Sequence, residues 1–388
     1  MLKMKKTIST YVTSGKRFVV YLIFLLPFTL FGQTPTYQCD IRNESFVSAN
    51  EFQFDIYLSR TGTTPFELAC FQTGLLINSA FLNGGTISAE IVPSTSGLNA
   101  SQAPQSIAFA SGTTNCLKIA PRTPPRNYAT GISSGTIIST GDGNRVCRVK
   151  LTNTNSFDGN PASYSWNFTP TPYNTIVSAF VSGSPVTINT VITSSPSQAV
   201  SQNTKVYLEG LFNGTNMNKA QDDMGDHFAG PVADVITVQL AEATAPYNIY
   251  KTFDNVLLYQ NGMASFSLPQ AESGPYYLVI KHRNSVETWS ANPISFSGSV
   301  NYDFTSAANS AYGDNLNIVS GKYVIFVGDV TQDGIIDGDD LALMDPDVIL
   351  GSTGYIASDL DGGGYIDGDD LVKIDPNIII GISTQRPY

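Results

Sequence analysis

Histidine and charged residues are scarce in this chain of 388 residues. It has two histidines, His227 and His282, and only 14% of its residues are charged. The hydrolase motif G-x-S-x-G, the zinc-protease motif H-E-x-x-H and phosphate-binding loops are absent. One histidine among scattered carboxylates is a weak metal site, so we expect His227 to lie at the surface. For His282 we expect a structural hydrogen-bonding role in place of catalysis. The sequence therefore favours a protein without enzymatic activity.

Cysteine is also sparse, and its four positions lie in the N-terminal half, at Cys39, Cys70, Cys116 and Cys147. None has C-x-x-C spacing, so a zinc site is unsupported. Four cysteines allow three disulfide pairings in an exported protein, but they can also be buried free thiols. The sequence leaves both alternatives open.

Basic stripes are missing as well. The net charge is −11, and the segment 329–375 alone carries thirteen aspartates and one lysine. Without a basic surface to neutralise phosphates, nucleic acid is excluded as an expected partner. The acidity belongs to one C-terminal segment and calls for a local explanation.

Long apolar runs occur only at the N-terminus. Basic residues, among them Lys3, Lys5 and Lys6, precede an apolar run over 18–31. This pattern predicts a secretory signal peptide over 1–32, although a retained N-terminal anchor is an alternative. No later run is long enough to cross a bilayer, so we expect no transmembrane span in the mature chain, which would be secreted or displayed at the cell surface.

The region 37–192 shows one strand pattern after another. Phe52, Phe54, Ile56 and Leu58 alternate with more polar residues, which is typical of a half-buried strand. Further strands are predicted over 68–77, 107–110, 146–151, 163–169, 175–181 and 186–189. About nine short strands with Gly, Pro and Asn between them indicate a jelly-roll or Greek-key β-sandwich.

Three aromatic residues share one face of the strand predicted over 163–169: Tyr164, Trp166 and Phe168. Exposed, they would form a platform on which sugars stack. Buried, they would fill the inner face of the sandwich, which we favour because a sandwich core needs large side chains.

Residues 193–204 are polar and lack aromatics, which predicts a linker. A second β-module follows over 205–326, with strands expected at 206–208, 236–240, 264–268 and 276–280. Its length and strand pattern suit an immunoglobulin-like sandwich. The chain is thus expected to be mainly β, with a small α-helical domain over 327–388.

That last domain contains two copies of one acidic pattern. The first reads D-V-T-Q-D-G-I-I-D-G-D-D from Asp329 to Asp340, and the second reads D-L-D-G-G-G-Y-I-D-G-D-D from Asp359 to Asp370. Both place oxygen-bearing or water-admitting residues at loop positions 1, 3, 5, 9 and 12, the spacing with which a twelve-residue loop surrounds Ca²⁺. Gly334 and Gly364 at position 6 permit the sharp turn.

The repetition continues past the loops, because 340–351 aligns without a gap on 370–381. Pro346 and Pro376 are expected to interrupt the helix that follows each loop, giving a short helix and then a short turn. Once Ca²⁺ is bound, we expect a set of apolar residues to pack as a two-fold pair: Leu341, Leu343, Met344, Ile366, Leu371, Ile374, Ile378 and Ile379.

A strand leads straight into Asp329 where an EF-hand would have a helix, and Asp replaces Glu at position 12. With these features, the last sixty residues resemble a type I dockerin, a family that binds two Ca²⁺ ions and docks onto cohesin domains. The resemblance implies ligands at Asp329, Thr331, Asp333, the Ile335 carbonyl, Asp337 and Asp340, and at Asp359, Asp361, the Tyr365 carbonyl, Asp367 and Asp370. Thr331 and Gly363 depart from the family pattern, and water would substitute at Gly363.

In dockerins, loop positions 10 and 11 face the partner. The resemblance therefore implies that Gly338 and Asp339, or Gly368 and Asp369, contact it, with either repeat able to dock. The first module is similar to a cohesin in its stretches 66–78 and 145–154, and the stretch 276–290 resembles modules found upstream of dockerins.

Together these features predict a secreted bacterial assembly protein: a cohesin-like sandwich, an immunoglobulin-like spacer and a calcium-dependent dockerin-like tail. The partner would be a cohesin-like domain of another secreted or cell-surface protein, or this chain's own N-terminal domain in trans. The alternative is a polysaccharide-binding accessory of an extracellular carbohydrate-degrading system.

Overall fold

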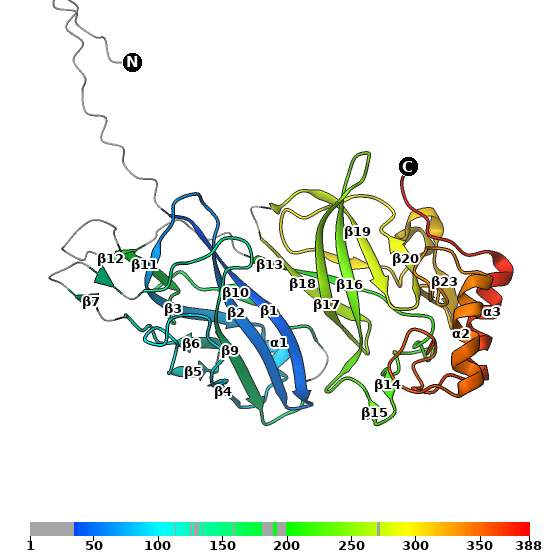
Figure 1. The fold of residues 1–388 in the computed structure, drawn as a ribbon, viewed down its shortest axis with the longest axis horizontal. Coiled ribbons are helices and arrows are strands. Elements are labelled where there is room, and N and C mark those ends of the chain that lie inside the picture. Colours follow the sequence, from blue (N-terminus) through cyan, green and yellow to red (C-terminus); the bar gives the residue numbers. More distant parts are fainter. Residues whose placement is uncertain are drawn as a thin grey trace, which may run out of the picture. The chain divides into compact units, whose positions relative to one another are not determined.

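The protein is mainly β, as its sequence predicts, with two C-terminal helices (Figure 1). The computed structural model describes residues 35–388, apart from 113, 125, 128–131, 134, 158–159, 181–188, 192–198 and 270–271. The predicted signal peptide lies outside these residues. Within them, no helix has the length and apolar character needed to cross a membrane.

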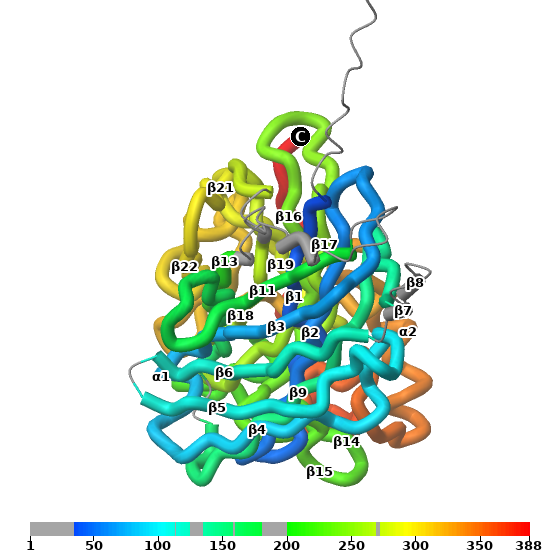
Figure 2. Tube along the Cα trace, turned by 90° about the vertical axis from the view of Figure 1, so that its left-hand side faces the viewer, coloured from blue at the N-terminus to red at the C-terminus, as the bar shows by residue number. Residues whose placement is uncertain are grey.

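The N-terminal module is built from two sheets. One has the order β1-β2-β9-β4, formed by Tyr37–Ser48, Glu51–Arg60, Asn144–Asn153 and Ile87–Ile91. The other has the order β12-β11-β3-β6-β5, formed by Asn189–Val191, Ile176–Phe180, Glu67–Ile77, Cys116–Ile119 and Ile107–Ala110, with β10 (Tyr164–Trp166) also paired to β3. Figure 2 shows β5, β6, β3 and β11 side by side. Two smaller elements complete it, the helical turn α1 (Ser79–Leu82) and the hairpin β7–β8 (Arg126–Asn127 and Ile132–Ser133).

Alternate apolar residues of the strands pack into the core between these sheets. Phe52, Phe54, Ile56 and Leu58 of β2 are all buried, as predicted. Tyr164 and Trp166 are buried in the same core and Phe168 is partly buried against it. The core interpretation of this strand is confirmed, and the described structure offers no exposed platform of these three residues.

All four cysteines are free thiols in the structure. Cys39, Cys116 and Cys147 are buried, and Cys70 is half-buried. Burial raises the pKa of the Cys39 thiol well above its ordinary value. Of the two alternatives left open by the sequence, the structure therefore has free thiols, three of which are buried as small apolar side chains.

One charged group is buried beside this core. Asp55 of β2 is fully buried and accepts hydrogen bonds from Arg148 of β9 (Nε–Oδ1 2.8 Å, Nη2–Oδ2 3.0 Å) and from Asn43 (2.7 Å). Burial alone would raise the pKa of Asp55, but these hydrogen bonds and the charges of Arg148 and Arg145 lower it below its ordinary value. The pair therefore joins β2 to β9 with its charge satisfied.

The second module consists of one eight-stranded sheet, whereas the sequence predicts the two sheets of an immunoglobulin-like sandwich. Its order is β20-β19-β16-β17-β18-β13-β22, formed by Ser285–Trp289, Pro275–His282, Val232–Glu242, Ile249–Tyr259, Met263–Pro269, Ala199–Lys205 and Asn301–Asp303, with β21 (Ile294–Ser295) paired to β19. Three register shifts interrupt the β16–β17 ladder. Such bulges bend strands, which lets one sheet curve around its own core.

Part of the predicted linker is a strand. Residues 199–204 belong to β13, which pairs antiparallel with β18 and parallel with β22. Gln202 and Thr204 are buried, because ladder hydrogen bonds satisfy their backbone and the side chain of Gln202 bonds to Gly298 and Val300. The prediction of a linker was wrong here because it was based on polar composition. Polar side chains can be buried in a strand when they are hydrogen-bonded, as that of Gln202 is. Residues 193–198 lie outside the described residues.

The hairpin β14–β15 (Gln221–Asp222, Gly225–Asp226) lies between β13 and β16 in the chain. Between β22 and the C-terminal helices lie two 3₁₀ turns, at Ala308–Ser310 and Tyr312–Asp314, and the hairpin β23–β24 (Asn317–Val319, Lys322–Val324). Helix α2 spans Gly338–Leu350 and helix α3 spans Gly368–Ile380. Each continues through its proline, so the predicted interruption at Pro346 and Pro376 is wrong. A proline removes a single N–H donor, and both helices instead end one turn later at Gly351 and Gly381 in the left-handed conformation.

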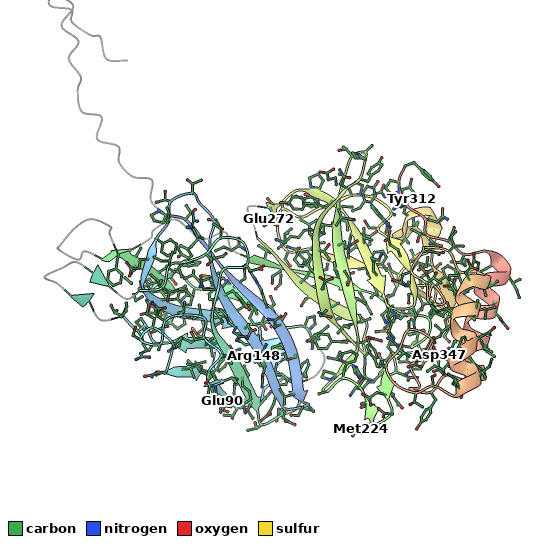
Figure 3. All side chains as sticks on the ribbon, viewed as in Figure 1. Glu90, Arg148, Met224, Glu272, Tyr312 and Asp347 are labelled. Atoms are coloured by element: carbon green, nitrogen blue, oxygen red, sulfur yellow. The ribbon has the colours of Figure 1, made fainter. Side chains whose placement is uncertain are left out.

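The Asp55 pair yields a prediction for the stability of the N-terminal module. Arg148→Ala leaves a buried carboxylate without its bidentate partner, and we expect it to lower the free energy of unfolding by about 3 kcal/mol. Arg42→Ala is the matched control, because Arg42 pairs with Asp40 near the surface (2.8 Å) and should cost less than about 1 kcal/mol. Urea unfolding measures the loss of stability in each variant. Equal losses would contradict the stabilising role of the buried Asp55–Arg148 pair. Figure 3 labels Arg148.

Candidate metal-binding loops and helix pair

Each acidic repeat forms a loop whose last four residues start a helix. Asp337 and Asp367 are the N-cap residues of α2 and α3, and each accepts a hydrogen bond from the N–H two residues on (2.8 Å). Asp340 and Asp370 complete a capping box by accepting from the N-cap N–H (2.9 Å). Loop positions 9 and 12 are thus fixed by helix capping, which satisfies donors that every helix start exposes.

Position 12 also closes the loop onto its own beginning. Asp340 Oδ1 accepts from the N–H groups of Val330 (2.8 Å) and Thr331 (2.9 Å). Asp370 Oδ1 does the same with Leu360 (2.8 Å) and Asp361 (3.2 Å). Both carboxylates are fully buried. This arrangement holds position 12 of each loop against the backbone of positions 2 and 3, directly after position 1.

Position 1 carries a buried oxygen with no hydrogen-bond partner in either loop. Asp329 and Asp359 are buried, and Oδ1 of each has no partner in the described structure. Burial, reinforced by Asp340 and Asp333, raises the pKa of Asp329 to about 6. Burial raises the pKa of Asp359 to about 7; the charge of Arg283 lowers this pKa, and the charges of Asp370 and Asp361 raise it. Ionising these carboxylates in the folded loop is costly at neutral pH unless a cation compensates.

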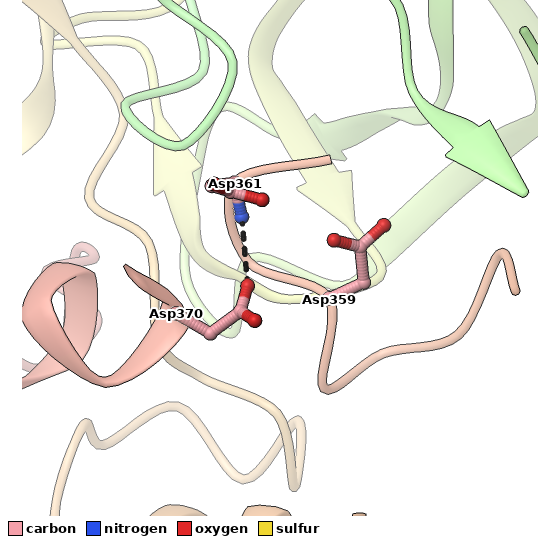
Figure 4. Close-up of side chains that lie close together, drawn as sticks. All are labelled: Asp359, Asp361 and Asp370. Atoms are coloured by element: carbon pink, nitrogen blue, oxygen red, sulfur yellow. Dashed lines mark hydrogen bonds between the residues drawn. The ribbon is translucent and has the colours of Figure 1, made fainter. Parts of the chain in front are cut away.

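In the second loop three carboxylates converge. Asp359, Asp361 and Asp370 offer ligand oxygens that all lie within 4.8 Å of one another (Figure 4). Among the described residues this is the one such group of acidic, His or Cys side chains. An all-oxygen donor set with an unpartnered buried carboxylate fits a hard cation such as Ca²⁺ better than a transition metal.

Most of the other predicted ligands are exposed. Asp333, Thr331 and the side chain of Ile335 are exposed in the first loop, as are Asp367 and the side chain of Tyr365 in the second. Gly334 and Gly364 have φ of +90° and +77°, so position 6 makes the left-handed turn for which glycine was expected. The roles of these ligands remain predictions.

Each loop is closed by the segment that follows the other repeat's helix. The N–H of Ile336 donates to Ile382 O (2.9 Å) beyond α3, and the N–H of Ile366 donates to Ser352 O (3.0 Å) beyond α2. This exchange makes the two repeats one interlocked unit. Neither loop can be removed without unpairing the other repeat.

The core under the loops draws on the eight-stranded sheet. Met344, Ile366 and Ile374 are buried as predicted, and Leu341, Leu371 and Ile378 are partly buried. Leu343 and Ile379 are exposed, which corrects the prediction that they pack inward. The core is completed instead by Val286 of β20, together with Phe326, Val327, Val330, Ile336 and Leu360. Two-fold self-packing was the wrong assumption, because β20 supplies part of the apolar surface.

Polar contacts reinforce this attachment. Asn377 of α3 is buried and donates to Glu209 Oε2 and to Val327 O, both at 2.8 Å. Glu209 Oε2 also accepts the N–H of Val327 (3.0 Å). The N–H of Gln221 donates to Gly362 O (3.0 Å) inside the second loop. The helical tail is therefore continuous with the sheet in packing and hydrogen bonding.

A buried polar network beside the second loop was missed by the sequence reasoning. Asp234 of β16 is fully buried and contacts His282, Arg283 and the hydroxyl of Tyr355. His282 Nδ1 also lies 3.1 Å from Ser285 Oγ, which confirms a structural role for this histidine. His227 stacks on Tyr355 with ring centroids 4.1 Å apart. No spacing rule links residues 234, 282 and 355, so only the fold reveals the network.

The helix pair exposes polar residues at its helix starts and apolar residues at its helix ends. Gly338, Asp339, Gly368 and Asp369, predicted to face a partner, are exposed at the helix starts. At the helix ends, equivalent repeat positions expose Ile349 (83%) with Leu350 (78%), and Ile379 (82%) with Ile380 (62%). The sequence analysis expected Ile379 to pack inward and did not single out Ile349, Leu350 or Ile380.

No protein-family model matches this chain, and no curated protein matches it. A solved type II cohesin–X–dockerin complex from Acetivibrio cellulolyticus matches at 18% identity over 46% of this chain and 95% of that one, with a TM-score of 0.27. A type II cohesin module of the ScaA scaffoldin from the same organism matches at 8% identity over 37% and 78%, with a TM-score of 0.22. The Actinomyces fimbrial adhesin FimA matches at 10% over 69% and 98%, with a TM-score of 0.21. This chain's own residues therefore carry the evidence for its function.

The turn at position 6 yields a testable difference between the loops. A Cβ at Gly364 would lie 3.0 Å from the backbone oxygen of Asp222, whereas one at Gly334 would meet the side-chain hydroxyl of Thr384 (2.9 Å), which can rotate away. Both substitutions to alanine force a left-handed residue, which costs about 1–2 kcal/mol. We expect Gly364→Ala to destabilise the chain by at least about 1 kcal/mol more than Gly334→Ala in chemical unfolding. A larger cost for Gly334→Ala would contradict the described packing.

Proposed function

We propose that this chain is a non-catalytic extracellular assembly protein whose calcium-loaded helix pair docks onto a cohesin-like domain of another protein. The observation that carries the proposal is the repeated exposed apolar pair, Ile349 with Leu350 and Ile379 with Ile380. Isolated exposed apolar residues are ordinary on protein surfaces. Pairs at equivalent positions of two repeats suggest a surface selected for a partner.

The duplication also bears on how docking would occur. Each helix begins with an exposed Gly-Asp pair and ends with an exposed apolar pair. A partner that recognises one helix would find a similar surface on the other. The proposal therefore includes two alternative docking orientations, one centred on each repeat.

Calcium is part of the proposal because the loops set the start of both helices. The unpartnered oxygens of Asp329 and Asp359 support a cation at each loop. In each loop, the residues that would hold Ca²⁺ are the four aspartates with the position 7 carbonyl, and Thr331 would join them in the first. The ion would supply the charge that lets these carboxylates converge. The chain's own N-terminal sandwich is a candidate partner in trans.

The polysaccharide-binding alternative has less support. Its sequence basis was the platform of Tyr164, Trp166 and Phe168, and two of these three side chains are buried. A buried aromatic ring cannot stack on a sugar.

Calcium should stabilise the full chain. We compare the melting temperature in 1 mM CaCl₂ with that in EDTA. A site whose free Ca²⁺ is 100 times its Kd adds about 2.7 kcal/mol to the free energy of unfolding, so the melting temperature should rise by several degrees. The double variant Asp329→Asn with Asp359→Asn should lose this shift, and MgCl₂ at the same concentration should produce a smaller one. Identical melting curves in CaCl₂ and EDTA would contradict calcium binding.

Docking should depend on the exposed apolar pairs of both helices. In surface plasmon resonance of the full chain against immobilised cohesin modules in calcium, we expect Ile349→Asp combined with Ile379→Asp to weaken binding at least tenfold, about 1.4 kcal/mol. Each single substitution should weaken it only a few-fold, because the other repeat still docks. Ile318→Asp is the matched control, since Ile318 is also an exposed isoleucine (61%) but lies on β23.

Two results would argue against this docking surface. Binding unaffected by the double substitution would place the partner elsewhere. A tenfold loss with Ile318→Asp would indicate a general effect of the added charge.

A further inference from the structure

The two acidic loops have different neighbours, although their sequences repeat. The turn between β19 and β20, Arg283-Asn284, lies against the second loop. Asn284 Nδ2 donates to Asp359 O (2.8 Å) and to Ala357 O (3.1 Å). Arg283 Nη2 donates to Asp359 O (3.2 Å), and its Nε donates to Ile356 O (3.3 Å). The backbone at position 1 of the second loop is thus held from outside the repeat.

Arg283 also brings a positive charge to the ligand itself. Its Nη2 lies 3.8 Å from Oδ2 of Asp359, the buried carboxylate whose other oxygen has no partner. The guanidinium is fixed in this position, because it pairs with buried Asp234 and stacks on the ring of Tyr355 with Cζ 4.3 Å from the centroid. A charge so confined cannot move aside when a cation enters the loop.

The first loop has no such neighbour. The backbone oxygen of Asp329 accepts from Gln332 Nε2 (2.6 Å), a neutral amide within the loop. Among the ion pairs of the described residues, none involves Asp329, Asp333, Asp337 or Asp340. Four ligand carboxylates therefore face an incoming ion without compensation in the first loop, whereas Arg283 offsets one of the four in the second.

We propose that Arg283 is a built-in counter-charge of the second loop, which holds Asp359 before the ion binds and makes this loop the weaker, later-filled of the two calcium sites. The inference rests on the calcium loading in the proposed function. The reason is electrostatic: a fixed cation beside a ligand repels a divalent ion and lowers the net charge that attracts it. Gly363 at position 5, which offers no side-chain oxygen, acts in the same direction.

Isothermal titration of the full chain with CaCl₂ tests this order. Asp359→Asn with Asp361→Asn leaves only the first loop intact, and Asp329→Asn with Asp333→Asn leaves only the second. We expect the second loop alone to bind at least tenfold more weakly than the first loop alone. Equal affinities, or a tighter second loop, would overturn the proposal.

The role of Arg283 itself is tested in the variant that retains only the second loop. There, Arg283→Gln should tighten calcium binding at least fivefold. Lys281→Gln is the matched control: it removes a positive charge from the same hairpin, where Lys281 pairs with Glu287 (3.2 Å), and should change the affinity less than twofold. Unchanged or weaker binding in Arg283→Gln would overturn the counter-charge role.

Arg283→Gln leaves Asp234 buried with one partner fewer, which could prevent folding. The double variant Asp234→Asn with Arg283→Gln removes both charges of that pair, and the same tightening is expected from it. Calorimetry reports on the ion alone, so a missing docking partner leaves these isotherms unchanged. An absence of calcium heat from both loops would overturn the calcium sites themselves, and this inference with them.

Discussion

A buried carboxylate oxygen without a hydrogen-bond partner needs a compensating charge, and this requirement governs the C-terminal part of the chain. Asp329 and Asp359 both present such an oxygen, at the same position of two repeats. Around each, a capping box fixes the start of a helix and a second carboxylate closes the loop. The same loop conformation therefore leaves this oxygen without a partner and sets the start of the helix. A cation at that point would connect loop charge to helix position.

The tail does not stand apart from the sheet before it. Val286 of β20 completes the tail's core, and Glu209 joins α3 to the chain that precedes the first loop. The hairpin residues Arg283 and Asn284 hold the second loop from the same side. A change of charge in the loops therefore acts on residues of the sheet, and these contacts with the sheet limit how far the loops can move. The natural unit for any experiment on the loops is thus the whole chain.

Local repetition made part of this structure predictable. Alternation identified β2 and its buried face, and the repeated D-x-x-x-x-G pattern identified both loops, their left-handed glycines and the helices after them. Helix interruption at Pro346 was predicted from a local rule, but one missing donor did not end the helix. The strand β13 was hidden by its polar composition, because its side chains are satisfied by partners about a hundred residues away. The network around Asp234 could not be predicted, since it joins three distant segments with no shared spacing.

The most direct test of the central claim is the calcium content of the purified full chain, measured by mass spectrometry of the metal after equilibration in 1 mM CaCl₂ and removal of free ion. We expect two calcium ions per chain, falling to about one in the Asp329→Asn variant. A content near zero in the unmodified chain would contradict this prediction, because the two unpartnered aspartate oxygens would then have to be accommodated without a metal ion.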